Sequence, residues 1–594
     1  MFEPMRPIQR QAVRGSLHPQ ARHSYIGQYR DRSFKIFMQH LLLSARKRGY
    51  QMGLGQLNFR YASRPPTQVR PTQQVRRFAT LTGSSTGGLG SGWGGYTLSR
   101  KLSAVKFSPT VISPRSYFVF TPLLTDAAIG SLDFSEIVEP VRDRYTKVHF
   151  IQAAARAVDF NKKTVTCEAS VVRSGVTETT RAKQHQHEKQ YWQRSKGGAD
   201  RQWESGETIM IPYDKLVVAV GCVSKTFNTP GVRENALFLK DVGDARRVKR
   251  RIRECFELAV LPNTDPQMQR YLLHFAIVGA GSTGIELAAS LCDFIHEDLV
   301  KVYPQLKEMI RITLFDVAPT VLSTFDESLS KYAMDTMERE GVDVKTDHHI
   351  ESLRWGEPNS PGPHEMDPKR CLTIKTKEDG EEGIAMCVWA TGNEMNEFVH
   401  DALGKVEAFP TSSVLERMDH TPAELPPQSA ATWSVRKAEK TGALLVDDHL
   451  RVRLQSNDGQ TVTFKDVFAI GDNCMLEKNS PPATAQSANQ EAIWLAKCLN
   501  ANDSDTGLSR YPAFSFRNLG MIAYVGHSRA LMQFPQSSQD KAKASHLPQG
   551  LTGYAAWLVW KGAYLSMSIS WRNRLRILYS WISNQVFGRD ISRY

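Results

Sequence analysis

Two short glycine-rich segments of this chain have the residue types and spacing to bind dinucleotides. Both fit the pattern G-x-G-x-x-G, and their glycines are Gly90, Gly92 and Gly95 in the first segment and Gly279, Gly281 and Gly284 in the second. A turn of this kind brings backbone N–H groups and a helix N-terminus onto a pyrophosphate. Two such turns predict two dinucleotides held face to face, the arrangement in which a flavin takes a hydride from a nicotinamide.

The second turn has the flanking elements that such a site needs. An apolar run over 274–278 predicts a buried parallel strand, and a helix is expected to start at Gly284. The next strand, over 310–315, ends at Asp316, whose carboxylate could accept hydrogen bonds from ribose hydroxyls. The gap from turn to acid exceeds the roughly 20 residues usual for this pattern, so we expect a long helix between them. The alternative is a glycine-rich turn with no ligand.

The first turn lacks an obvious preceding strand. The stretch 80–89 is rich in Thr, Ser and Gly, which favours a flexible linker over a central strand. Either 78–81 forms a short strand and the rest bulges out, or the strand is absent. After the turn, a helix over 96–102 and a strand near 110–113 are expected.

Composition and cysteine usage exclude several classes of protein. The 594 residues can form about three domains, and 41% hydrophobic content suits a sizeable core. The eight cysteines are scattered, with no C-x-x-C pair and no set of metal ligands, so a disulfide reductase is not indicated and no metal is expected.

The net charge of +14 is concentrated at the N-terminus. Glu3 and Asp31 are the only acidic residues within 1–80, which is otherwise rich in arginine and lysine. This composition predicts a mitochondrial transit peptide, and 76–79 resembles a processing site. The alternative is a disordered basic tail that binds nucleic acid, but no nucleic-acid module follows it and no nucleic-acid partner is expected.

The C-terminal region has the character of a membrane-surface helix. No uncharged apolar stretch is long enough to span a bilayer. The segment 551–571 is rich in Trp, Tyr, Leu and Met, and Trp571, Leu575, Leu578 and Ile582 follow at helical spacing. Arginines among them could reach lipid head groups, as in a helix lying in the membrane interface. The alternative is a helix that packs in the core or forms a dimer.

Further strands that end in glycine complete an interleaved α/β pattern. They cover 213–221, 386–392 and 466–472. Small residues at Ala390 and Gly392 would let the backbone approach a ligand, and Asp472 could bond a ribityl hydroxyl of flavin. The predicted fold is α/β, with two Rossmann-like dinucleotide-binding domains and a C-terminal amphipathic membrane anchor. The expected divisions are 1–80 leader, 81–238 first part of the FAD domain, 239–455 NADH domain, 456–510 second part of the FAD domain, and 511–594 membrane association and dimerisation.

Several longer segments resemble the type II (alternative, non-proton-pumping) NADH:quinone oxidoreductases of mitochondria. The matching segments are 113–124, 388–393, 468–472, 483–491 and the ending 581–591. The resemblance covers roughly 89–594. It implies that hydride passes from NADH to FAD and that two electrons then pass to ubiquinone. It also implies a peripheral enzyme of the mitochondrial inner membrane, with the matrix face slightly favoured, and a homodimer.

The resemblance also assigns residues. NADH would bind along the second turn, with Asp316 on the adenosine ribose and Glu286 near the nicotinamide carboxamide. FAD would bind along the first turn, and its further contacts would be Ser113, Arg115, Thr121 and Asp472. Gln486 and Gln490 would border the quinone pocket from one helix face, where their amides can donate to a quinone carbonyl. Without the resemblance, these two glutamines are ordinary helix-surface residues.

Two other functions stay open from the sequence. A sulfide:quinone oxidoreductase shares the fold, but it depends on cysteines beside the flavin and has no use for an intact NADH turn. A catalytically idle, flavoprotein-like interaction protein is the second alternative. Flavin content and NADH turnover separate it from an enzyme.

Overall fold

The structure is a computed structural model, and it describes part of the chain. The described residues are 76–81 (backbone), 90–143, 148–170, 208–360, 366–367, 370–414, 432–501, 508, 510–535 and 550–591. Most of the predicted leader therefore lies outside the described residues. The stretch immediately before the first glycine turn, 82–89, lies outside them as well.

The strand before the first turn is present. β1 (Arg76–Leu81) lies in the middle of a sheet, paired in parallel with β2 (Phe107–Ser113) on one side and β8 (Lys215–Val218) on the other. The short-strand interpretation of 78–81 is confirmed. The predicted leader of 1–80 includes β1, and processing at 76–79 would remove most of this strand, leaving β2 paired only with β5 and β8 paired only with β22.

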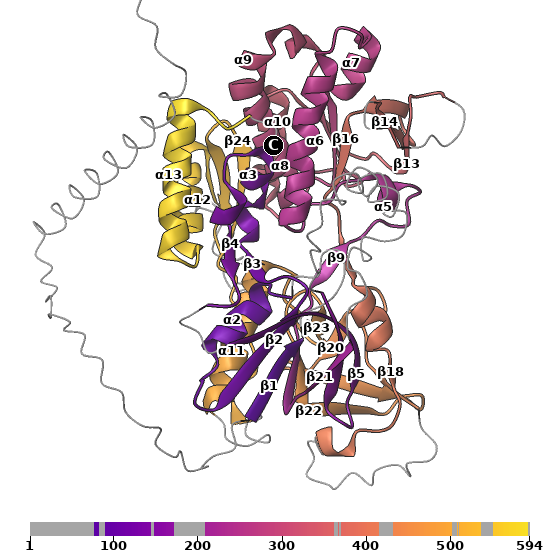
Figure 1. The fold of residues 1–594 in the computed structure, drawn as a ribbon, viewed down its shortest axis with the longest axis vertical. Helices are drawn as coiled ribbons and strands as arrows, with labels where there is room; N and C mark the ends of the chain where they lie inside the picture. Colours follow the sequence, from indigo (N-terminus) through magenta and orange to yellow (C-terminus); the bar gives the residue numbers. More distant parts are fainter. Residues whose placement is uncertain are drawn as a thin grey trace, which may run out of the picture. The chain divides into compact units, whose positions relative to one another are not determined.

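The first sheet has 12 strands in the described residues, in the order β18-β19-β21-β22-β8-β1-β2-β5-β6-β7 with β20 and β23 beside this path. Its centre, from β22 to β5, is parallel, and both flanks are antiparallel. Its other strands are β5 (His149–Asp159), β6 (Thr164–Ala169), β7 (Thr208–Pro212), β18 (Lys405–Val406), β19 (Trp433–Val435), β20 (Leu444–Val446), β21 (Arg451–Ser456), β22 (Thr461–Ala469) and β23 (Cys474–Leu476). Helices α2 (Trp93–Lys101) and α11 (Ala485–Ala501) pack against each other beside β1 and β2 (Figure 1).

The second sheet is parallel, in the order β12-β11-β10-β16. Its strands are β10 (His274–Val278), β11 (Arg311–Phe315), β12 (Val342–Lys345) and β16 (Met386–Trp389). The helices around it are α6 (Val242–Ala259), α7 (Pro266–Leu272), α8 (Ser282–Phe294) and α10 (Glu327–Arg339). The strands β13 (Ile350–Trp355), β14 (Leu372–Thr376) and β15 (Gly380–Ile384) form an antiparallel ribbon.

The long gap between the second turn and Asp316 is not one long helix. After α8, the chain forms a π-helix (Ile295–Leu299), the short α9 (Val300–Val302) and a 3-10 helix (Pro304–Met309). These insertions lengthen the connection between α8 and β11, but β11 still pairs in parallel with β10. The extra residues in the gap therefore leave the dinucleotide-binding unit intact.

One predicted domain boundary is wrong. The division placed 239–455 in the NADH domain, but β18, β19, β20 and most of β21 belong to the first sheet. The chain leaves the second sheet at Trp389 and crosses through β17 (Asn393–Met395), which pairs with β9 (Cys222–Ser224). The polar stretch after this crossing has no strong periodicity, so its short edge strands were hard to predict.

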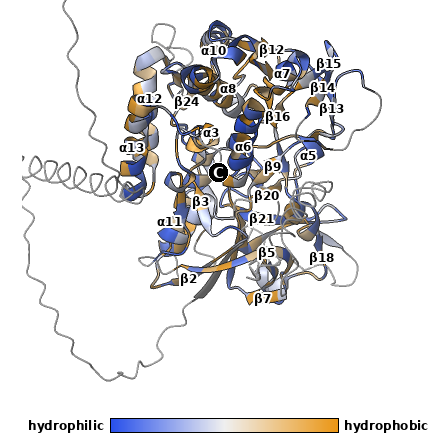
Figure 2. Ribbon diagram, turned by 45° about the horizontal axis from the view of Figure 1, so that its top comes forward, coloured by the Kyte–Doolittle hydropathy of each residue, from blue (hydrophilic) through white to orange (hydrophobic). Residues whose placement is uncertain are grey.

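The C-terminal region forms a third sheet and two helices. The strands are β24 (Met521–Gly526), β25 (Arg529–Gln533) and β26 (Gly550–Thr552), and the helices are α12 (Gly553–Met567) and α13 (Trp571–Phe587). Helix α12 is coloured mainly white and orange in Figure 2, and α13 mixes blue with apolar positions. No helix in the described part of the chain is long and apolar enough to cross a membrane. The predicted α/β architecture, with two sheets whose parallel strands flank the glycine-rich turns, is confirmed.

Candidate active site

The second glycine turn has the geometry that a dinucleotide requires. Gly279 follows β10 with φ of +107°, and α8 begins directly after Gly281 with no side-chain cap among the described residues. A Cβ on Gly284 would lie 1.8 Å from the Gly279 carbonyl oxygen, so the helix and the strand can approach this closely only with glycine there. The uncapped N–H groups of α8 are available to a phosphate.

Asp316 stands at the end of β11, as the sequence predicts. One carboxylate oxygen accepts a hydrogen bond from Ala280 N in the glycine turn, and the other accepts one from Ala318 N at 2.8 Å. The carboxylate therefore links the ends of β10 and β11. It lies beside the turn, where the adenosine ribose of a dinucleotide is bound in folds of this kind.

Ala390 and Gly392 lie on the other side of the same turn. Ala390 N donates to the Val278 carbonyl at 2.8 Å, and a Cβ on Gly279 would lie 2.9 Å from the Ala390 carbonyl oxygen. Gly392 has φ of +48°, a left-handed conformation that glycine adopts at little cost. The structure brings these small residues and the second turn together at the carboxyl ends of β10 and β16.

Glu286 projects from the first turn of α8 that follows Gly284, and its side chain is buried. Its Oε1 accepts a hydrogen bond from Tyr524 N of β24 at 3.3 Å. Burial raises the pKa of Glu286 to about 8, against the opposing effects of this bond and of the Trp560 indole. Glu286 is thus placed next to the C-terminal region.

The first glycine turn also leads into a helix N-terminus with no side-chain cap among the described residues. Helix α2 starts after Gly92, and the buried Gly90 and Gly95 flank that start. A Cβ on Gly94 would lie 3.1 Å from the Ile470 side chain, at the end of β22. The turn thus lies against the carboxyl ends of the central parallel strands, where nucleotides bind in sheets of this type.

Ser113 and Arg115 lie beside this turn, after β2. The buried Ser113 hydroxyl accepts a hydrogen bond from Arg115 N at 3.1 Å. The Arg115 guanidinium forms an ion pair with Asp241. Its Nη1 is buried and has no hydrogen-bond partner among the described residues. A buried guanidinium nitrogen of this kind fits an anionic or polar group of a bound dinucleotide, so the residues present fit FAD.

Thr121 lies beside the first turn, and Asp472 follows the carboxyl end of β22. The Trp93 indole, within the first turn, donates to Thr121 Oγ1 at 3.0 Å. Asp472 follows Gly471, which has φ of +78°, and Cys222 Sγ lies 3.4 Å from Asp472 Oδ2. The predicted FAD residues of four segments therefore gather around the start of α2.

Two residues that the sequence analysis did not select hold this edge together. Asn473 accepts a hydrogen bond from Gly221 N at 3.1 Å and donates to the Val218 carbonyl at 3.1 Å. The buried Glu491 accepts one from Gly471 N at 2.6 Å, and burial raises its pKa to about 7. Glu491 ends one of the segments that carry the resemblance and Asn473 directly follows another, but the hydrogen-bond partners of both residues are distant in sequence and left no local pattern.

Gln486 and Gln490 lie in α11, on the face turned toward 517–520. Gln486 accepts from Leu519 N at 3.0 Å, and its amide nitrogen lies 3.4 Å from the Gly520 carbonyl. Gln490 exchanges two hydrogen bonds with the backbone of Arg517. Both side chains thus have protein partners in this structure, and a quinone contact by them stays a prediction.

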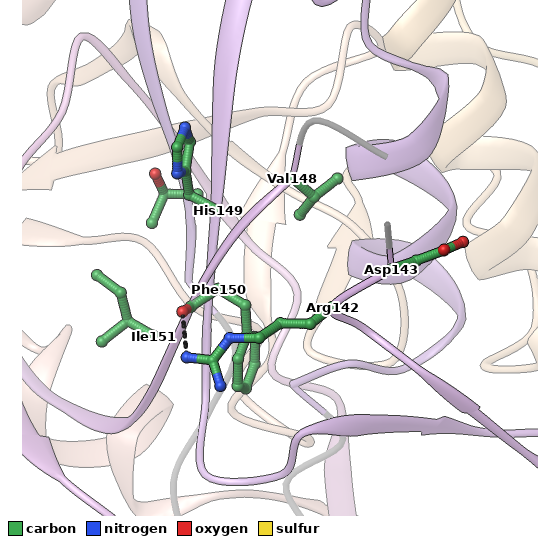
Figure 3. A pocket seen from close by; sticks show the side chains of 7 residues that line it. Arg142, Asp143, Val148, His149, Phe150 and Ile151 are labelled. Atoms are coloured by element: carbon green, nitrogen blue, oxygen red, sulfur yellow. Dashed lines mark hydrogen bonds between the residues drawn. The ribbon is translucent and has the colours of Figure 1, made fainter. Parts of the chain in front are cut away.

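A cavity of about 580 Å³ lies at the start of β5, and Figure 3 shows the side chains around it. It is lined by Thr110, Arg142, Asp143, Val148, His149, Phe150 and Ile151. Arg142 donates to the Phe150 carbonyl at 3.0 Å and covers the Phe150 ring. Since His149 begins β5, the cavity lies toward the amino ends of the parallel strands. It is not the dinucleotide site.

Known proteins match nearly the whole chain. A family model described as pyridine nucleotide-disulphide oxidoreductase matches residues 89–408, and one described as the NDH2 C-terminal domain matches 518–590. A mitochondrial external alternative NAD(P)H-ubiquinone oxidoreductase B1 from Solanum tuberosum is 30% identical, covering 85% of this chain and 89% of the relative. The chain belongs to the alternative NADH-ubiquinone oxidoreductase family.

Other members of this family give the same result. The external NADH-ubiquinone oxidoreductase 2 of Saccharomyces cerevisiae is 31% identical, covering 89% of this chain and 86% of the relative. A solved structure of NDH2 from Plasmodium falciparum shares the fold, with a TM-score of 0.64 at 20% identity, and covers 88% of this chain and 100% of that one. As an alternative NADH-ubiquinone oxidoreductase, the chain is a flavin-dependent enzyme that uses FAD, oxidises NADH and reduces quinone.

Proposed function

We propose that the two glycine turns hold NADH and FAD as the sequence predicts. NADH lies along the turn before α8, with its ribose on Asp316 and its nicotinamide toward Glu286. FAD lies along the turn before α2, with Ser113, Arg115, Thr121 and Asp472 around it. The observation that carries this assignment is the pair of uncapped helix N-termini, each at the carboxyl ends of parallel strands. Bound FAD supplies a two-electron acceptor between the nicotinamide and the quinone.

The protein residues contribute alignment and protection from water. The aromatic rings of Trp93, Phe120 and Tyr564 form a continuous group from the first turn to α12, with ring centroids 5.5 and 6.2 Å apart. This group covers the space beside Thr121, where the resemblance places the flavin ring. We infer that it excludes water from the hydride-transfer site.

We infer that quinone enters beside α11. Gln486 and Gln490 border this entrance, and the segment 517–520 that they hold passes over it. Each amide nitrogen has two hydrogens, so a quinone carbonyl can accept one while the backbone carbonyl accepts the other. This supplies a physical reason for amides at these positions, because the amide oxygen also accepts from a backbone N–H.

We propose that α12 and α13 seat the enzyme on a membrane surface. Trp571, Leu575, Leu578 and Ile582 are all exposed, between 42% and 74%, and therefore do not pack in the protein core. The opposite face of α13 is buried through Asn573, Ile577 and Trp581. An exposed apolar face of this kind fits a lipid interface better than water. The alternative occupant of this face is a second copy of the chain, as in the predicted homodimer.

We propose that the enzyme lies on the mitochondrial inner membrane, delivered by a leader that ends before β1. The relatives from potato and yeast are named external enzymes. Those names favour the intermembrane-space face over the matrix face that the sequence slightly favoured. Intact mitochondria that express the chain should oxidise added NADH. Oxidation only after the inner membrane is opened would assign the enzyme to the matrix.

Substrate competition tests the proposed chemistry. Purified full-length enzyme should reduce a short-chain ubiquinone with NADH and should not do so with sulfide. Quinone reduction that runs with sulfide and ignores NADH would instead support the sulfide:quinone alternative. A flavin-free protein that binds NADH without turnover would support the idle interaction protein.

A further inference from the structure

A polar cavity of about 750 Å³ is lined by residues of α3 (Leu124–Ile129), α8, β24, α12 and α13. Its lining includes two buried carboxyl groups, those of Asp126 and Asp293. Glu297, whose side chain is 51% exposed, lies on the solvent side of the lining. The proposed dinucleotide and quinone contacts leave this cavity unused.

One face of α8 connects the cavity to the NADH site. Glu286, Ser290 and Asp293 are spaced i, i+4 and i+7, so they lie along the same side of the helix. All three are buried, and Ser290 and Asp293 line the cavity. Glu286 lies at the end of this row nearest the glycine turn. The helix therefore carries polar groups from the cavity toward the nicotinamide.

Tyr524 joins the two carboxyl groups of this row. Its backbone N–H donates to Glu286 Oε1 at 3.3 Å, and its hydroxyl donates to Asp293 Oδ2. The Tyr524 ring also lines the cavity. A single residue thus contacts both the Glu286 carboxylate and the Asp293 carboxylate of the cavity.

The cavity has a polar group that water can satisfy. The Trp560 indole lines the cavity and is buried, and its Nε1 forms no hydrogen bond of normal geometry with a described residue. It lies near enough to the Glu286 carboxylate to lower its pKa. A buried N–H without a partner is costly, and a cavity of this size can hold several waters. Water at Trp560 would therefore lie between the cavity and Glu286.

Burial raises the pKa of both cavity carboxyl groups above the ordinary aspartate value. Burial raises the pKa of Asp126 to about 6, while Lys561 and Arg589 and the Trp581 indole oppose this rise. Burial also raises the pKa of Asp293, opposed by its bonds from Tyr524 and His527. Groups with pKa values near the working pH are efficient proton carriers.

The reaction requires a proton from solvent. NADH and quinone react with one proton to give NAD⁺ and quinol, because the hydride carries two electrons and only one of the two hydrogens that quinol gains. The second hydrogen must enter as a proton. Among the proposed NADH and FAD contacts, Glu286 is the one that the Tyr524 hydrogen bonds link to a carboxyl group of this cavity.

We propose that this cavity is the proton inlet of the enzyme, and that Asp126 and Asp293 relay the proton through cavity water to Glu286 at the redox centre. Both aspartates are positioning residues, since they act through Glu286 and touch neither substrate. The proposal deepens the quinone reductase function and rests on it. It accounts for a row of buried polar groups on α8, where a purely structural helix would carry apolar side chains.

The test uses full-length Asp293→Asn and Asp126→Asn enzymes with two electron acceptors. Quinone reduction takes up a proton, whereas ferricyanide takes electrons only. We expect NADH:quinone turnover to fall about tenfold or more, within the range of general acid–base effects, while NADH:ferricyanide turnover and flavin content stay near wild type. A solvent deuterium isotope effect should grow in the variants, and a small diffusible acid such as azide should restore part of the quinone turnover.

Glu136→Gln is the matched control. Glu136 is a buried carboxyl that accepts a hydrogen bond from Ser580 of α13 at 2.7 Å, but it does not line the cavity. Its variant should keep both activities. Equal loss of both activities in the aspartate variants, or unchanged quinone turnover without a new isotope effect, would overturn the inlet. Wild-type enzyme that reduces ferricyanide but no quinone would instead refute the function on which the inlet rests.

Discussion

Gln490 holds the backbone of Arg517 with both ends of its side-chain amide. Its nitrogen donates to the Arg517 carbonyl at 2.8 Å, and its oxygen accepts from Arg517 N at 3.0 Å. Gln486, one helical turn earlier, holds Leu519 in a similar way. The two glutamines therefore fasten 517–520 to α11, at the place where the family resemblance puts quinone.

Replacing Gln490 by Glu should separate its role in holding the backbone of Arg517 from its proposed role in binding quinone. A carboxylate can accept from Arg517 N but cannot donate to the Arg517 carbonyl or to a quinone. We expect the KM for quinone to rise about tenfold, which corresponds to about 1.4 kcal/mol, while ferricyanide reduction is kept. Steady-state kinetics with both acceptors measure this effect. The Asn489→Asp variant is the control, because the Asn489 amide oxygen accepts from Thr97 and a carboxylate can keep that bond. An unchanged quinone KM in Gln490→Glu would remove Gln490 from the quinone site.

The second glycine turn offers a matched pair of substitutions. Gly284→Ala places a Cβ 1.8 Å from the Gly279 carbonyl oxygen, whereas Gly281→Ala places one where no described atom lies within 4 Å. We expect Gly284→Ala to raise the KM for NADH more than tenfold and to lower the melting temperature. The Gly281→Ala variant should fold normally, and any loss of activity should come from weaker NADH binding alone. Thermal unfolding and NADH titrations compare them, and equal melting temperatures would contradict the close-contact argument.

Replacing Asp316 by Asn should relax the preference for NADH over NADPH. Hydrogen bonds from Ala280 N and Ala318 N hold the Asp316 carboxylate beside the turn. At this position its negative charge would repel a 2′-phosphate. We expect the ratio of kcat/KM values to move toward NADPH by about tenfold, or about 1.4 kcal/mol. Asp343→Asn, at an exposed ion pair on the neighbouring strand, is the control. An unchanged cofactor ratio would show that another group selects the nucleotide.

The exposed face of α13 should bind membranes. Truncation of the C-terminal helices is a poor test, because Ala556, Trp557 and Trp560 of α12 are buried in the core. Serine substitutions at Trp571, Leu575 and Ile582 change the exposed face alone. Each exposed apolar side chain is worth about 1.5–3 kcal/mol when buried, so flotation with vesicles should drop more than tenfold.

The same variant should use short-chain quinone normally and long-chain quinone poorly. Serines at Val105 and Met210, which are also highly exposed but lie outside the helices, provide the control. Vesicle binding that survives the α13 changes would assign the apolar face to a second copy of the chain. Light scattering would then show dissociation of that dimer.

The pKa of Glu286 predicts a pH dependence of stability. Burial raises this pKa to about 8, so the folded state binds the proton more tightly than the unfolded chain. The stabilisation is fully present below the ordinary glutamate pKa and is lost as pH rises through about 8. Glu286→Gln should therefore become more stable than wild type as pH increases over this range. Melting temperatures of both proteins across this range measure the difference, and parallel curves would contradict the shift.

The glycine turns were predictable from sequence because each one needs specific residues at fixed spacing. β10, β11 and Asp316 followed for the same reason, since apolar runs next to such a turn form parallel strands. The family resemblance also selected Thr121, which contacts the start of α2, and Asp472, which follows the strand end that packs against α2. Cofactor contacts by all of these residues stay predictions.

The remaining features depend on contacts between distant parts of the chain. β1 is short and is followed by glycine and serine, so its local sequence gave little indication of a strand. Pairing with β2 and β8 stabilises it. The hydrogen bonds of Gln490 and the cavity beside Asp293 exist only when 517–535 and the C-terminal helices pack on α8 and α11. No spacing rule in the sequence encodes such pairings.

The flavin absorbance spectrum of the purified chain, recorded under anaerobic conditions, tests whether the two glycine turns serve one electron path. We expect a bound flavin whose visible band bleaches when NADH is added and returns when ubiquinone is added. A protein that binds no flavin, or whose flavin band is indifferent to NADH, would contradict the assignment of the two glycine turns to one electron path.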